Sequence, residues 1–85
     1  MRIRLNLDVL KPHSPSSFFL AHELKKISGV TYVQIKVDEI DQKTTSVFIK
    51  IIGEDLILEE ITDKLEELNC ALHSVDEVSI QDVES

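Results

Sequence analysis

Four carboxylates in the first half of the chain could bind a metal ion. Asp8 lies near the end of one segment of alternating apolar residues, and Asp38, Glu39 and Asp41 lie at the end of another. Several carboxylate oxygens at one place are the ligands that Ca²⁺ and Mg²⁺ prefer. The spacing is not that of an EF-hand loop, however, and acids beside a hairpin are often simply hydrated. The pattern therefore leaves two interpretations open: a site for Ca²⁺ or Mg²⁺, and a solvated acidic rim.

A histidine with two nearby acids stands close to the C-terminus: His73 with Asp76 and Glu77. Such a group can bind a ligand or a transition metal, or transfer a proton. On a regular strand His73 and Asp76 would point to opposite faces, unless a bulge rotates one of them. The alternative is an ion pair of Asp76 with Arg4, because an antiparallel register of the last strand on the first brings them together.

Lys11 and His13 form a third candidate site, for an anion. They precede a candidate helix, and the N-terminal end of a helix favours negative charge. The loop has no glycine-rich cradle of the kind that holds phosphate groups. The sequence contains no Ser-His-Asp order, no CxxC and no HExxH, so an enzyme would depend on His73 alone and we expect none.

The elements that must position these residues follow from the spacing of the apolar residues. Along the chain, apolar residues recur first with the two-residue period of a strand, then with the period of a helix, then in two segments with the period of a strand. A second helical segment and a last strand segment follow, which predicts two helices among four strands. The side chains expected to face inward are Ile3, Leu5, Leu7, Val9, Leu20, Leu24, Ile27, Val33, Ile35, Val37, Val47, Ile49, Ile51, Leu58, Ile61, Leu65 and Leu68. In the last strand, residues 70–80, the apolar positions do not share one parity, and a bulge would reconcile them.

Local signals set the expected boundaries of these elements. Pro12 should end the first strand, and Ser14 followed by Pro15 should begin the first helix. Gly29 and Asn69 are suited to the left-handed conformation that follows a helix. On the second helix, Glu60 and Lys64 have the spacing of a favourable i,i+4 ion pair.

The order β-α-β-β-α-β is the signature of a ferredoxin-like, split βαβ sandwich of the α+β class. Right-handed crossovers place the first and third strands in the centre of a four-stranded antiparallel sheet, with both helices on one face. We expect residues 1–80 to form this single domain and residues 81–85 a polar tail. The first two strands then end at one rim, which would bring the four carboxylates together near His73.

Two segments carry a resemblance to a known family: Leu5-Asn6-Leu7-Asp8-Val9-Leu10-Lys11-Pro12-His13 and His73-Ser74-Val75-Asp76-Glu77-Val78. Between them, Gly29-Val30, Val33-Gln34-Ile35 and Glu39-Ile40-Asp41 fit the same pattern. Residues 2–78 resemble the archaeal family known as domain of unknown function 211. The resemblance implies a ferredoxin-like fold, ring-like homo-oligomers in an archaeal cytoplasm and no established activity. The chain departs from the family at Ile57, where members tend to carry a helix-capping Asp.

Composition narrows the classes of function. The net charge is −7, yet residues 1–50 carry +3 and residues 51–85 carry −10. Basic residues cluster only weakly, so we expect no nucleic-acid partner. No apolar run reaches the ~20 residues that cross a bilayer, so we expect no membrane partner. Cys70 is the only cysteine, which excludes an internal disulfide and favours a buried thiol in a reducing cytoplasm.

The uneven charge predicts self-association. One edge of the expected sandwich is basic and the opposite edge acidic, and unlike edges favour a head-to-tail contact that can close into a ring. The residues assigned to this interface are Phe19, Lys25, Lys26, Lys36, Glu66 and Glu67. Phe19 points away from Leu24, so either a loop or a frayed first helical turn shields it, or another subunit contacts it. The sequence thus favours a non-enzymatic homo-oligomeric binding module that holds a divalent cation or small ligand at its acidic rim or subunit junctions. The alternative is a regulatory domain that senses an amino acid or a nucleotide.

Overall fold

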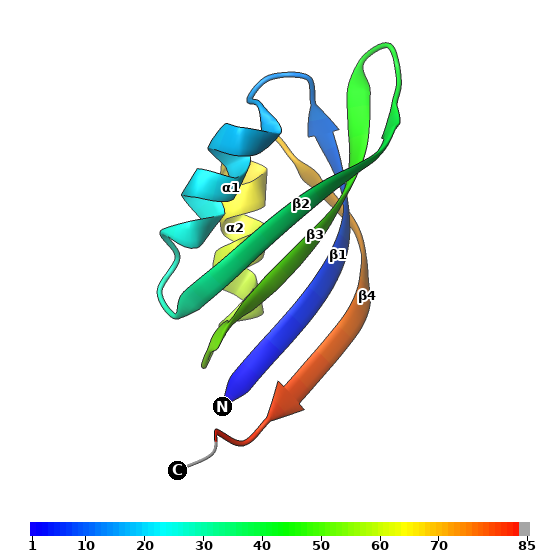
Figure 1. Ribbon diagram of the computed structural model, residues 1–85. Coiled ribbons are helices and arrows are strands. Elements are labelled where there is room, and N and C mark those ends of the chain that lie inside the picture. Colours follow the sequence, from blue (N-terminus) through cyan, green and yellow to red (C-terminus); the bar gives the residue numbers. More distant parts are fainter. Residues whose placement is uncertain (84–85) are drawn as a thin grey trace.

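The computed structural model of the protein describes residues 1–83 and has the predicted ferredoxin-like order of elements (Figure 1). The elements are β1 (Arg2–Pro12), α1 (Ser17–Lys25), β2 (Val30–Ile40), β3 (Thr44–Glu54), α2 (Leu58–Glu67) and β4 (Ala71–Gln81). Both helices lie on one face of the sheet, and the other face is open. Gln81 belongs to β4 and not to the expected tail, of which Glu84 and Ser85 lie outside the described residues.

The sheet has the order β2-β3-β1-β4, so the prediction of β1 and β3 as central strands is confirmed. All neighbouring strands are antiparallel, and their registers align residues in rows across the sheet. One row contains Val33, Ile51, Leu5 and Val78, each paired with the next. Val33 and Val78 therefore lie at the same level on the two opposite edges of the sheet.

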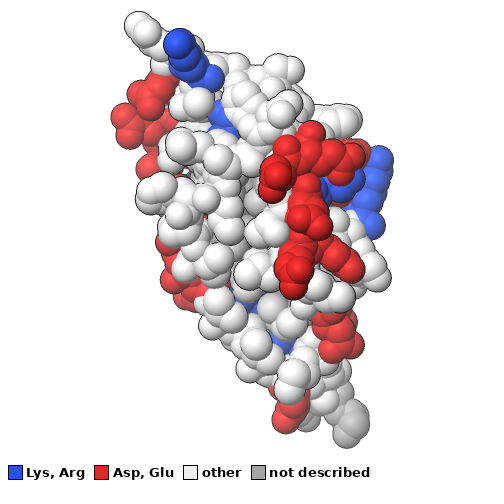
Figure 2. Space-filling model, turned by 180° about the vertical axis from the view of Figure 1, so that it is seen from behind, with Lys and Arg blue, Asp and Glu red and all other residues white. Residues whose placement is uncertain are grey.

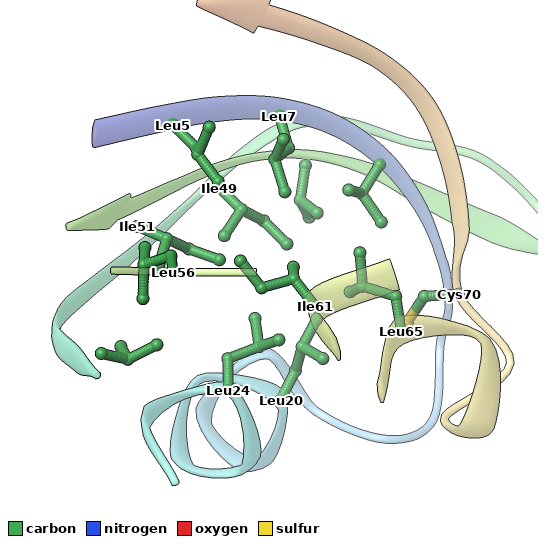
Figure 3. Close-up of a cluster of buried hydrophobic side chains, with 13 residues drawn as sticks. Leu5, Leu7, Leu20, Leu24, Ile49, Ile51, Leu56, Ile61, Leu65 and Cys70 are labelled. Atoms are coloured by element: carbon green, nitrogen blue, oxygen red, sulfur yellow. The ribbon is translucent and has the colours of Figure 1, made fainter. Parts of the chain in front are cut away.

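The core lies between the sheet and the helices. Figure 3 shows Leu5, Leu7, Ile49 and Ile51 on the sheet facing Leu20, Leu24 and Ile61 on the helices. Most of the side chains expected to face inward are buried or packed against this cluster. Full burial of one such aliphatic side chain stabilises the fold by about 1.5–3 kcal/mol.

Two expected core positions are exposed. Val37 is 47% exposed because the β2–β3 hairpin extends beyond the helices, as Figure 1 shows. Leu58 is 41% exposed because it is the first residue of α2, and the buried residues of this helix, Ile61 and Leu65, lie farther along it. The spacing of apolar residues identifies the inward side of each element. Which of the inward side chains are buried also depends on the area of the sheet that the helices cover.

The helix boundaries differ from the prediction at one end. The N-cap of α1 is Ser16, whose Oγ accepts a hydrogen bond from the Phe19 backbone N–H at 3.1 Å. The expectation of Ser14 at the cap is therefore wrong, because Pro15 lies before the cap and not inside the helix. Asn69 has a φ of 63°, as predicted for the residue that follows α2.

The expected ion pair of Glu60 with Lys64 is replaced by other partners. The Nζ of Lys64 lies 3.3 Å from Glu67 and 3.9 Å from Glu23 on α1. Lys64 thus links the two helices, which a pattern confined to one helix cannot predict.

A close backbone contact positions the start of β2. The Glu54 N–H donates to the Gly29 carbonyl at 2.9 Å, and Gly29 has a φ of 88°. A Cβ at Gly53 would collide with the same carbonyl, so both glycines are needed for this approach. The contact holds the first residues of β2 beside β3 and opposite α1.

Candidate functional site

Two bulges give β4 its shape. His73 and Asp76 have no partner residue on β1, and the register shifts at both positions. The predicted bulge is therefore confirmed, with a second one beside it. The two bulges place the apolar side chains of β4 on one face, where Leu72, Val75, Val78 and Ile80 lie opposite Val9, Leu7, Leu5 and Ile3.

The bulges also bring polar side chains together on the open face of the sheet. His73 Nδ1 lies 3.6 Å from Asp8 Oδ2. Ser74 Oγ donates to Asp76 Oδ1 at 2.6 Å, and Asn6 Nδ2 donates to Glu77 Oε1 at 2.7 Å. These bonds orient the acids of β4 along the edge of the sheet.

The expected pair of Asp76 with Arg4 is wrong. Arg4 lies opposite Ser79, because the bulges displace Asp76 from the position that a regular register would give it. The acid instead accepts a hydrogen bond from Ser74, two residues away on its own strand.

The four carboxylates of the predicted acidic rim do not form one cluster. Asp8 pairs across the sheet with Phe48, which pairs with Lys36, so Asp8 lies at the level of Lys36. Asp38, Glu39 and Asp41 lie farther along, at the tip of the hairpin. Within residues 1–83, no three His, Cys, Asp or Glu side chains are placed to hold a metal ion.

Lys11 binds backbone carbonyl groups and does not form the expected anion site. Its side chain is 3% exposed, and Nζ donates to the carbonyls of Pro12 and Pro15, each at 2.7 Å, with His13 O at 3.4 Å. His13 Nε2 lies 2.9 Å from the carbonyl oxygen of Asp41, at the β2–β3 turn. Both side chains thus hold the loop that precedes α1, and the Lys11 ammonium group is occupied by backbone oxygens.

A groove lies between α1 and β2. Its volume is about 310 Å³, and it is lined by Phe18, Ala21, His22, Lys25, Thr31, Tyr32 and Val33. The Phe18 ring is 77% exposed and meets the His22 ring edge to face at 4.9 Å. The sequence did not predict this groove, because its residues form no motif and only the packing of α1 on β2 brings them together.

Within residues 1–83, no loop shields the exposed aromatic rings of α1. Phe19, like Phe18, lies at the surface, so the interpretation in which a loop or a frayed first turn shields it is wrong. The other interpretation, contact of Phe19 with another subunit, remains a prediction.

The basic residues of this flank differ in their partners. Lys26 Nζ donates to Glu23 Oε2 at 2.8 Å, and this bond lowers the pKa of the Glu23 carboxyl from its ordinary value. Lys25 and Lys36 enter none of the ion pairs formed within residues 1–83. Their charges are thus available to a partner.

The opposite flank, made by β4 and α2, is apolar and acidic. Val75, Val78 and Ile80 are exposed on β4, and Ile57 is exposed where α2 begins. Figure 2 shows this side of the molecule as a mostly uncharged band, in which a few basic atoms are visible, with acidic side chains along both of its sides. The acids of these two elements are Glu59, Glu60, Asp63, Glu66, Glu67, Asp76 and Glu77.

The sequence is similar to those of known proteins. Residues 3–83 match the DUF211 family, described as uncharacterized ArCR. An uncharacterized protein of Methanocaldococcus jannaschii is 41% identical over 75 residues, which cover 88% of this chain and 77% of that protein. Neither described helix is long and apolar enough to cross a membrane.

Proposed function

The chain belongs to the uncharacterized ArCR family, and we propose that it acts as a non-enzymatic binding module that assembles head to tail into a ring. In this assembly the flank formed by α1 and β2 of one copy contacts the flank formed by α2 and β4 of the next. Small ligands or divalent cations bind where copies meet.

The two unprotected edges of the sheet carry the proposal. β2 and β4 are each eleven residues long, and each pairs with a neighbour on one side only. Long exposed edges with apolar side chains invite pairing with another chain. Val78 and Ile80, 57% and 59% exposed, lie on the side of the sheet that the helices cover elsewhere. Contact between edges would remove these side chains from water.

The charges favour unlike edges over like edges. Lys25 and Lys36 belong to α1 and β2, whereas Asp76 and Glu77 belong to β4. A two-fold contact between β4 edges would bring the acids of both copies together, and a head-to-tail contact places Lys25 and Lys36 near them instead. The assembly therefore uses two different surfaces of each copy, and such a contact closes into a ring when its rotation allows.

The ligand part of the proposal concerns the tip of the β2–β3 hairpin. Asp38, Glu39 and Asp41 enter none of the ion pairs described for residues 1–83. Ca²⁺ or Mg²⁺ shared between copies would offset their charge. Either ion should raise the melting temperature of the protein. The double variant Glu39→Gln, Asp41→Asn should lose this response and Asp63→Asn, on α2, should keep it; equal responses would remove the cation from the proposal.

Light scattering at micromolar concentration and low salt tests the assembly. We expect a mass well above that of a dimer. Salt should reduce it, because exposed charges are screened beyond about 10 Å at 0.1 M. A monomer under these conditions contradicts the proposal.

A further inference from the structure

We infer that the groove between α1 and β2 receives the exposed apolar row of β4, formed by Val75, Val78 and Ile80, from a second copy of this chain. The inference rests on the proposed head-to-tail assembly and specifies which side chains meet in it. The occupant of the groove is therefore a strand edge of an identical subunit.

The groove fits an apolar occupant of modest size. Phe18 and Ala21 form its wall on α1, and Tyr32 and Val33 form its wall on β2. Its volume of about 310 Å³ is at the small end of the range for ligand pockets, and it is open on one side. A row of aliphatic side chains can enter such a groove without the enclosure that a bound small molecule requires.

The β4 row lacks a cover within its own chain. Val75, Val78 and Ile80 share the inward side of the sheet with the buried core, yet all three are exposed. Only Leu72, at the beginning of β4, is packed against the core. Exposed apolar area is unfavourable in water, and a contiguous patch of it marks an interaction surface.

The groove and the row lie at the same level of the sheet. Val33 lines the groove and is aligned through Ile51 and Leu5 with Val78 on the opposite edge. When copies are related by rotation about an axis parallel to the strands, each residue keeps its position along that axis. Val78 of one copy therefore meets Val33 of the next. Surfaces at different levels would instead shift each copy along the axis and produce an open helix.

The charges are aligned in the same way. Lys36 is aligned through Phe48 and Asp8 with Ser74, whose hydroxyl holds Asp76. Seating Val78 at Val33 therefore brings Lys36 of one copy to the level of Ser74 of the next, whose hydroxyl donates to the Asp76 carboxylate. Hydrophobic and charged contacts thus require the same alignment.

Bulges limit the backbone contribution to this contact. β2 is irregular at Thr31 and Asp38, and β4 is irregular at His73 and Asp76. A bulge at an edge interrupts hydrogen bonding with an added strand. Side-chain docking into the groove, and not one continuous ladder, is therefore the main contact.

Two variants test the inference, one on each surface. Val78→Arg places a charge in the row, and Ala21→Arg fills the groove. Leu10→Arg, on the open face of the central strand β1, is the matched control. Circular dichroism should show all three folded; the first two should be monomers and the control should assemble as the wild type does.

A mixture of the two variants separates this interface from others. Ala21→Arg keeps an intact row and Val78→Arg keeps an intact groove. An equimolar mixture can therefore form one good junction, and light scattering should show a dimer where each variant alone is a monomer. A mixture that stays monomeric contradicts the inference.

Tyr32 reports directly on the groove, because the chain has one tyrosine and no tryptophan. Acrylamide should quench its fluorescence several-fold less in the wild-type assembly than in Val78→Arg. If the wild type assembles and Val78→Arg assembles equally well, the inference fails and the proposed function stands. If the wild type is a monomer, both fail. If amino acids, added one at a time, protect Tyr32 in monomeric Val78→Arg, the occupant is a small effector and the inference is overturned.

Discussion

Lys11 Nζ donates to the carbonyl oxygen of Pro15 at 2.7 Å, from a side chain that is almost fully buried. The same ammonium group contacts the carbonyls of Pro12 and His13. One cation thus joins the end of β1 to the residue before the Ser16 cap of α1. Because α1 forms one wall of the groove, this buried lysine also fixes where that wall stands.

Lys11→Met should destabilise the protein without changing its fold. The substitution keeps the aliphatic stem but leaves the three carbonyl groups without their donor, which costs about 1–3 kcal/mol. Urea unfolding at constant protein concentration measures the change. Lys43→Met, at an exposed position of the hairpin, should stay within about 0.5 kcal/mol of the wild type. Equal midpoints for the two variants would show that the bonds of Lys11 do not matter.

An acid at position 57 should stabilise the protein. Ile57 occupies the N-cap of α2 with extended backbone angles and makes no side-chain cap, and Glu60 stands at the matching capping-box position. Ile57→Asp should raise the free energy of unfolding by about 0.5–1 kcal/mol. Ile57→Ala separates the cap from the loss of the exposed side chain, and should give no gain. Stability of Ile57→Asp at or below that of Ile57→Ala would refute the capping argument.

Cys70 should make stability depend on pH in the alkaline range. Burial raises the pKa of its thiol above the ordinary value of 9.0, so the folded chain holds this proton more tightly than the unfolded chain does. The thiol's contribution to the free energy of unfolding is complete below the pKa that it has in the unfolded chain, and it is lost as the pH rises above that value. Cys70→Ala should lose less stability than the wild type between pH 8 and about 10. The check is urea unfolding across this range, and parallel pH profiles would count against it.

The same burial should slow the reaction of Cys70 with thiol reagents. The thiol is 5% exposed and its pKa is raised, so both access and thiolate content are low at pH 8. We expect labelling by an aromatic disulfide reagent to be at least about tenfold slower in buffer than in urea. Similar rates in the two solvents would indicate that the connection between α2 and β4, which carries Cys70, opens readily.

The sequence was sufficient for the fold because one buried face controls the spacing in each element. Leu5, Leu7 and Val9 alternate because every second residue of β1 enters the core. Lys11 continues the same parity, and its burial could have been inferred from that. Its partners could not, since they are carbonyl groups whose positions depend on the path of the loop.

The irregular parts of the chain were harder to predict. Val75 differs in parity from Leu72 and Val78, which indicated a bulge but not its position, and so the partner of Asp76 was predicted wrongly. Ser14 and Ser16 flank Pro15 with the same side chain, so residue type could not choose the cap. The groove was missed because its walls come from two elements, and single-element patterns carry no signal of their contact.

Sedimentation velocity of the wild type at micromolar concentration, in low and high salt, tests the central claim most directly. The proposed contact between the α1–β2 flank and the α2–β4 flank predicts one discrete species larger than a dimer in low salt, which loosens as salt screens the charges. A monomer in low salt, or a two-fold dimer that salt strengthens, would contradict recognition between unlike edges.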